Sequence, residues 1–154
     1  MRVIALYNIK GGVGKTAAAV NLAWHSARDG RPTLLWDLDP QGAASWCLQV
    51  PPKVKGGRKA LLRGKSPLAR SVTPTAYDNL ELLPADFSYR NMDLDLSEKK
   101  RPEKQLRKLL DAVQAAAASP KAGLRRYGRL DHAWILMRLH SGLRTGEVRR
   151  LRPG

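Results

Sequence analysis

Residues 10–16 read KGGVGKT and stand between a short apolar run and a stretch with helical spacing. Glycines let the backbone turn tightly and aim consecutive N–H groups at phosphate oxygens, and the helix that follows adds its positive N-terminal end. Lys15 would reach the β- and γ-phosphates, and Thr16 would offer its hydroxyl to Mg²⁺. The stretch therefore predicts a phosphate-binding loop, whose candidate nucleotide-binding residues are Gly11, Gly12, Val13, Gly14, Lys15 and Thr16.

The segments around this loop predict an α/β fold. Residues 2–8 (RVIALYN) are rich in β-formers, and a helical pattern runs from Lys15 to a stop at Gly30. Residues 33–37 (TLLWD) read as a strand buried on both faces, as in a parallel sheet, and residues 79–83 (NLELL) read as a third strand. The order strand, helix, parallel strand is the βαβ unit, which is right-handed in nearly all proteins.

The rest of the chain predicts a connector and helices. Residues 51–77 are rich in Pro, Gly, Lys and Arg, which is typical of a solvated connector with at most one short helix, over 59–63. Apolar residues form one stripe along 103–118, which predicts a helix, and a second, Arg-rich helix is expected over about 130–140. All four tryptophans and Cys47 are expected in the core.

The loop differs from the common P-loop pattern, because Ile9 stands where that pattern has glycine and Lys10 follows it. This form, together with DLDPQG at 37–42 and LELLPAD at 80–86, resembles the deviant Walker A family of ParA, MinD and Soj partition and positioning ATPases. The resemblance covers roughly residues 1–113. It implies an α/β fold with the three-layer parallel sheet of P-loop NTPases, and ATP and Mg²⁺ as cofactors.

The resemblance also implies a role for three further residues. Lys10 would be the signature lysine that reaches the partner's nucleotide in an ATP-bound sandwich dimer, where an added cation stabilises charge on the γ-phosphate. Asp39 would orient the attacking water, and Asp37 would lie near the Mg²⁺ shell beside Thr16. Two structural alternatives stay open, since Asp39 could instead be a helix N-cap and Asp37 could be purely structural.

The function that the resemblance implies is an ATP-dependent dimerisation switch for the partitioning of plasmid or chromosome DNA. Its partners would be a second copy of the chain, non-specific DNA and a centromere-binding ParB-like adaptor. The expected location is the cytoplasm, on the nucleoid when DNA is bound, because we find no signal peptide and no apolar run of about 18 residues. Membrane positioning of the MinD kind is disfavoured, because no clear amphipathic membrane helix is present at the C-terminal end.

The resemblance stops before the end of the chain, which divides it into a partial ATPase domain over 1–113 and a basic, helical tail over 114–154. The family's Walker B strand, ending in Asp, is not recognisable there. HSGLRTGEVRRLR at 140–152 instead resembles the first arginine box of tyrosine recombinases, in which Arg144 would bind the scissile phosphate. The tail could equally be an ordinary amphipathic helix, or the product of a reading-frame slip in the gene near 137–140.

The charge of the chain favours a polyanionic partner. Lys and Arg number 28 against 13 Asp and Glu, which gives a net charge of +15. A basic solvated surface without a partner accounts for the same excess. The rival functions are therefore a truncated or fused remnant that binds nucleic acid by charge alone, and a tyrosine recombinase fragment. The three histidines lack ligand spacing, so no histidine metal site is expected.

Overall fold

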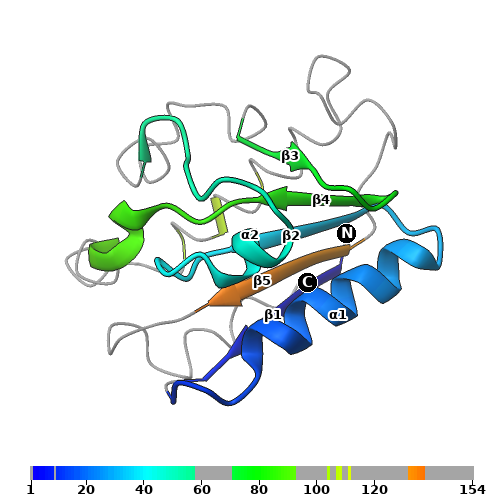
Figure 1. Cartoon of the computed structure of the whole chain (residues 1–154), viewed down its shortest axis with the longest axis horizontal. Helices are drawn as coiled ribbons and strands as arrows, with labels where there is room; N and C mark the ends of the chain where they lie inside the picture. The colour runs from blue at the N-terminus through cyan, green and yellow to red at the C-terminus, as the bar shows by residue number, and fades with distance from the viewer. Residues whose placement is uncertain are drawn as a thin grey trace.

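The computed structural model describes residues 2–8, 10–57, 71–92 and 132–137, the last by their backbone alone, and the single positions Lys104, Arg107, Lys108 and Asp111. Within these residues one five-stranded sheet has the order β1-β5-β2-β4-β3 (Figure 1). Its strands are β1 (Arg2–Tyr7), β2 (Thr33–Asp37), β3 (Thr73–Pro74), β4 (Leu80–Leu83) and β5 (His132–Met137). The strands β1, β5, β2 and β4 run parallel, and β3 is antiparallel to β4. The sheet is thus mixed, so the expectation of a purely parallel sheet was wrong at β3.

Strand β5 corrects the helix expected over 130–140. It lies between β1 and β2 and is hydrogen-bonded to both, with Ile4 and Leu35 each in register with Trp134. A short apolar run is compatible with a strand or a buried helix, and periodicity alone does not separate the two. The strand conformation is favoured here because a strand between β1 and β2 forms hydrogen bonds with the backbone N–H and C=O groups of both neighbours. The other tail residues, Arg144 among them, lie outside the described part of the chain.

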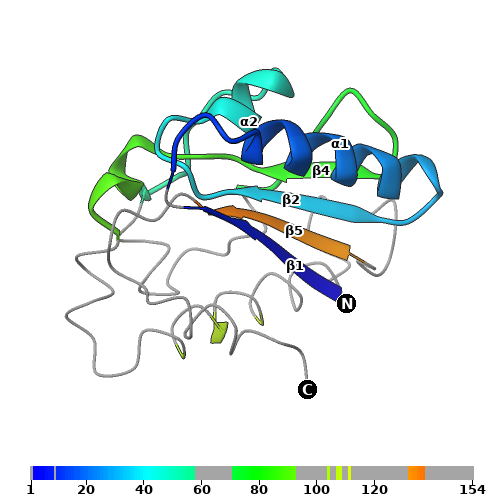
Figure 2. The ribbon, with the colours of Figure 1, turned by 90° about the horizontal axis from the view of Figure 1, so that it is seen from below.

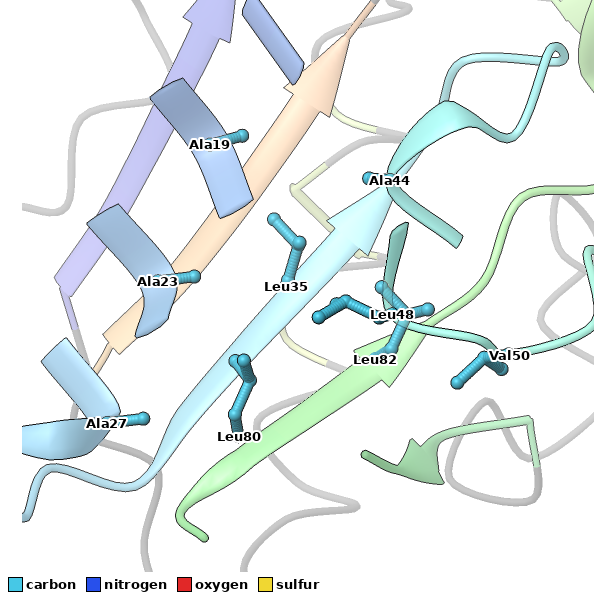
Figure 3. Packing of buried hydrophobic residues seen from close by; sticks show 9 residues of the cluster. All are labelled: Ala19, Ala23, Ala27, Leu35, Ala44, Leu48, Val50, Leu80 and Leu82. Carbon is cyan, nitrogen blue, oxygen red and sulfur yellow. The ribbon is translucent and has the colours of Figure 1, made fainter. Parts of the chain in front are cut away.

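Two helices lie on one side of the sheet, as Figure 2 shows: α1 (Lys15–Arg28) and α2 (Ala43–Cys47). The alanines of α1 at 19, 23 and 27 recur every fourth residue and are fully buried against the sheet. In Figure 3 their side chains point toward Leu35 of β2 and Leu80 of β4, with which they form one hydrophobic cluster. Small side chains at this spacing let α1 approach the sheet closely, which brings the loop before α1 close to the end of β2.

The strand β2 is buried along its whole length, as expected of a central strand with both faces covered. Strand β4 matches the third expected strand within one residue. The four described positions between 104 and 111 are helical, in agreement with the helix expected over 103–118, while the short helix expected over 59–63 lies outside the described residues. In the part of the chain that the structure describes, no helix has the length and apolarity to cross a bilayer.

The expectation of four core tryptophans was wrong for Trp46, whose exposed fraction is 80%, and right for Trp36, which is buried. Cys47, expected to be buried, is also exposed. Both residues end α2, a helix of five residues with one face on the core. Such a short helix offers too few positions for its buried face to be identified from spacing.

Glu81 of β4 is a buried carboxyl group in an apolar strand. Its side chain points to the opposite face from its neighbours Leu80 and Leu82, which pack under the helices. It is 6% exposed, and among the described residues its Oε2 has no hydrogen-bond partner. Burial disfavours the charged form and raises the pKa of Glu81 to about 7.

Because this carboxyl group is buried, we expect the free energy of unfolding of the chain to fall as the pH rises. The pKa of Glu81 is higher in the folded than in the unfolded chain. Its contribution to stability is therefore fully present below about pH 4.5 and is lost progressively as the pH rises through about 7. We expect a loss of about 1–2 kcal/mol, and replacement by Gln should remove it. Urea unfolding of wild type and Glu81→Gln at pH 5 and pH 8 measures this difference; equal pH dependence in both would contradict it.

Candidate nucleotide site

The loops after β1 and β2 leave the same edge of the sheet (Figure 1). A cavity of about 360 Å³ lies between these two loops. Because parallel strands end at the same edge, the glycine loop and the loop after β2 meet there. The cavity is lined by Gly11, Gly12, Val13, Gly14, Lys15, Thr16, Ala17 and Asp39. The structure therefore brings all six expected nucleotide-binding residues and Asp39 to one place.

The glycine loop has the shape of a phosphate cradle. Gly12 and Gly14 have φ angles of 72° and 81°, a conformation that side-chain-bearing residues rarely adopt. A Cβ atom added at either would meet no atom within 4 Å, so the loop leaves open space on that side. The helix α1 begins at Lys15, directly after the loop, and the first N–H groups of a helix have no acceptor within it. An anion such as a triphosphate fits this open, positively polarised loop.

The two lysines of the loop have different positions. Lys15 lines the cavity, and its Nζ donates a hydrogen bond of 2.9 Å to the carbonyl oxygen of Lys10. The Lys10 backbone N–H donates to Asn8 Oδ1 at 2.9 Å, which ties the loop to the end of β1. Lys10 itself is exposed and does not line the cavity, so its side chain is accessible from outside.

Asp39 is held in a tight turn at the edge of the cavity. Its Oδ1 accepts a hydrogen bond of 3.0 Å from Gln41 N–H, and its carbonyl oxygen accepts one of 2.9 Å from Gly42 N–H. The residue is 8% exposed. The N-cap of α2 is Gly42, so the alternative that Asp39 caps this helix was wrong.

Asp37 lies behind this turn and does not line the cavity. It is fully buried, its Oδ1 accepts a hydrogen bond from Asp39 N–H, and its Oδ2 accepts two from Ser45. Burial raises the pKa of Asp37, and the hydrogen bonds from Ser45 and from Asp39 N–H offset part of that rise. Sequence reasoning missed Ser45, whose only signal is a small polar residue eight positions after Asp37.

Among the described residues no group of three or more His, Cys, Asp or Glu side chains could hold a metal ion by itself. Mg²⁺ keeps several waters and is commonly bound through one or two protein groups together with substrate phosphates. The hydroxyl of Thr16, in the first turn of α1, is available as such a protein group.

Gly42 closes the turn in a conformation and at a distance from its neighbours that disfavour any side chain. Its φ angle is 65°, and an added Cβ would lie 3.0 Å from Pro52 Cβ and 3.5 Å from Ala85 Cβ. We expect Gly42→Ala to destabilise the chain by about 1–3 kcal/mol through left-handed strain and crowding. Chemical unfolding measures the change, with Gly11→Ala as the control, since no atom lies within 4 Å of a Cβ there. An equal, small effect at both positions would contradict the geometry.

A family profile and two curated proteins match the part of the chain that contains the glycine loop and Asp39. A family profile described as an AAA domain (AAA_31) matches residues 1–116. The chromosome partitioning protein ParA of Caulobacter vibrioides is 36% identical over 122 residues, which are 75% of this chain and 43% of that protein. The chromosome-partitioning ATPase Soj of Thermus thermophilus is 51% identical over 85 residues, 55% of this chain and 32% of that protein.

A solved structure also resembles this fold. The cobyrinic acid a,c-diamide synthase of Mycobacterium smegmatis, with a bound ATP analog and magnesium, has a TM-score of 0.70 and 27% identity. The match covers 88% of this chain and 50% of that protein. The chain thus spans about half the length of this structure, and less than half of the curated relatives it matches.

Proposed function

This chain belongs to the ParA/Soj family of AAA-domain partition ATPases, and from that premise we propose that it binds Mg-ATP in the cavity between the glycine loop and Asp39. The observation that carries the proposal is the lining of that cavity. It combines seven consecutive residues, 11–17, which follow β1, with Asp39, which follows β2. Further support comes from the open space beside Gly12 and Gly14. Hydrolysis of the bound ATP is part of the proposal.

The roles proposed for the side chains follow from their positions. The N–H groups of the loop and the Lys15 ammonium hold the triphosphate, and Thr16 offers its hydroxyl to the magnesium ion. Bound ATP supplies the phosphoryl group for transfer to water, and Asp39 orients that water from the edge of the cavity. We propose that Lys10, which is exposed, reaches the nucleotide of a second molecule. Asp37 does not line the cavity, so its contribution to the site is indirect.

We extend the proposal to a switch in which ATP binding promotes a homodimer that binds DNA without sequence preference and responds to a ParB-like adaptor. The net charge of +15 supports the DNA contact, because Lys and Arg release counterions from the phosphate backbone on binding. The exposed Lys10 beside the cavity supports the dimer, since a cation from a partner would stabilise charge on the transferred phosphoryl group. The proposed location is the cytoplasm, at the nucleoid.

The test is retention of the chain on non-specific duplex DNA at increasing salt, with and without Mg-ATP. We expect salt-sensitive binding that requires Mg-ATP and is lost in Lys10→Ala and Lys15→Ala. Equal DNA binding with and without Mg-ATP would contradict the proposed switch and would support a basic remnant that binds DNA by charge. A loss found only in Arg144→Ala would support the recombinase-like tail instead.

A further inference from the structure

The hydroxyl of Ser45 lies in the middle of a buried chain of hydrogen bonds behind the nucleotide cavity. Ser45 Oγ accepts from Ala85 N–H at 2.9 Å, and it donates its own proton to Asp37 Oδ2 at 2.9 Å. A second bond of 2.9 Å, from Ser45 N–H, reaches the same carboxylate oxygen. Ser45 and Asp37 are both fully buried, so water cannot replace any of these partners cheaply.

The same carboxylate reaches forward to the cavity. Asp37 Oδ1 accepts a hydrogen bond of 3.1 Å from the backbone N–H of Asp39, a residue that lines the cavity. Two sets of hydrogen bonds therefore hold the turn that carries Asp39. Gln41 and Gly42 donate to Asp39 within the turn, and the Asp39 N–H donates to Asp37 outside it. Asp37 is therefore hydrogen-bonded to Ser45 through one oxygen and to the backbone of Asp39 through the other.

This network reaches elements that are distant in sequence. Ala85 follows β4, and the next residue, Asp86, accepts hydrogen bonds of 2.9 Å from Val54 N–H and from Ser88 N–H. Although burial raises it, the pKa of Asp86 is held below its usual value by the hydrogen bonds from Ser88 and Val54. The Asp39 turn is thus anchored to the loop after β4, which is itself fixed by an ionised carboxylate.

We propose that Ser45 is a positioning residue, which holds Asp39 at the edge of the nucleotide cavity by orienting the buried carboxylate of Asp37. Asp37 then acts through protein contacts, because it lies outside the lining of the cavity and its two oxygens accept three hydrogen bonds from the chain. For its consequence on turnover, the proposal rests on the proposed ATP-binding function. Its structural part, the anchoring of the turn, is independent of any ligand.

The first test needs no nucleotide: amide-resolved hydrogen exchange by NMR on the full chain, comparing wild type with Ser45→Ala. We expect the amides of Asp39 and residue 45 to exchange about tenfold faster in the variant, with no change in the amides of α1. The matched control is Ser26→Ala, which also removes a hydroxyl hydrogen bond, here of 2.9 Å to Thr33, at the far end of β2 from Asp39. Unchanged exchange at Asp39, or faster exchange throughout the chain, would overturn the proposal.

The second test separates positioning from a merely structural effect. In Ser45→Ala we expect the kcat for ATP to fall about tenfold while the Kd for Mg-ATP stays within about twofold, because the glycine loop and Lys15 are unaffected. Ser45→Thr, which retains the hydroxyl, should restore turnover, and Ser26→Ala should retain it. Equal kcat in Ser45→Ala and wild type would overturn the proposal. If the wild type itself binds no Mg-ATP, the proposed function fails, and hydrogen exchange still decides the role of Ser45.

Discussion

Lys15→Ala is expected to abolish the stabilisation of the chain by Mg-ATP. A ligand at 100 times its Kd stabilises the folded state by about 2.7 kcal/mol, which corresponds to a rise in Tm of roughly 5–10 °C for a chain of this size. Lys15 provides a fixed cation in the cavity, so its removal leaves the phosphate charge facing the backbone dipoles of the loop. Thermal melts of wild type and variant, each with and without Mg-ATP, measure the difference.

The control for this experiment is Lys55→Ala, which removes an exposed lysine that does not line the cavity. It should retain the full rise in Tm. The melting temperatures without nucleotide should be similar in all three proteins, because the hydrogen bond from the Lys15 side chain to the Lys10 carbonyl is exposed. A Lys15→Ala variant that Mg-ATP still stabilises as strongly as wild type would refute the assignment of the phosphate loop.

The parts of the site that were predictable from sequence are those whose chemistry is local. A glycine loop between a strand and a helix binds phosphate through its own backbone, so KGGVGKT at 10–16 predicts both the structure and the ligand. Asp39 was indicated only by the resemblance of DLDPQG at 37–42 to the partition ATPases, and in the structure it closely follows β2, where the ends of parallel strands converge on one edge.

What was not predictable depends on partners distant in the chain. Strand β5 owes its conformation to hydrogen bonds with β1 and β2, and nothing within residues 132–137 distinguishes a strand from a buried helix. The contact of Ser45 with Asp37 depends on the turn at Gly42, which brings α2 back to the end of β2. A serine eight positions after an aspartate has no such meaning until that turn is known.

The position of β5 has a consequence for the nucleotide site. It separates β1, which leads into the glycine loop, from β2, which leads into the Asp39 turn. The distance between these two loops is therefore set by a strand that comes late in the sequence, so the cavity requires residues from both halves of the chain. A fragment that ends after residue 113 would lack this spacer between β1 and β2.

Asp39→Asn is expected to retain Mg-ATP binding and to lose turnover. The amide oxygen of Asn can still accept the hydrogen bond that Gln41 N–H donates to Oδ1, so the turn is preserved while the negative charge is removed. Groups that orient or deprotonate a nucleophile contribute about 10²–10⁴-fold to the rate, and we expect a fall in kcat within that range. Steady-state turnover and an ATP-binding titration on the same protein samples measure the two quantities separately.

Two further variants distinguish the charge of Asp39 from its role in the turn. Asp39→Ala removes both the charge and the acceptor for Gln41 N–H, so it should lose turnover to the same extent as Asp39→Asn and also unfold at lower denaturant concentration. Asp29→Asn removes an exposed carboxylate at the far end of α1 and should leave kcat unchanged. If Asp39→Asn turns over ATP within about twofold of wild type, the carboxylate is not required for hydrolysis. Asp39 would then serve only to close the turn, because the Asn side chain supports that turn equally well.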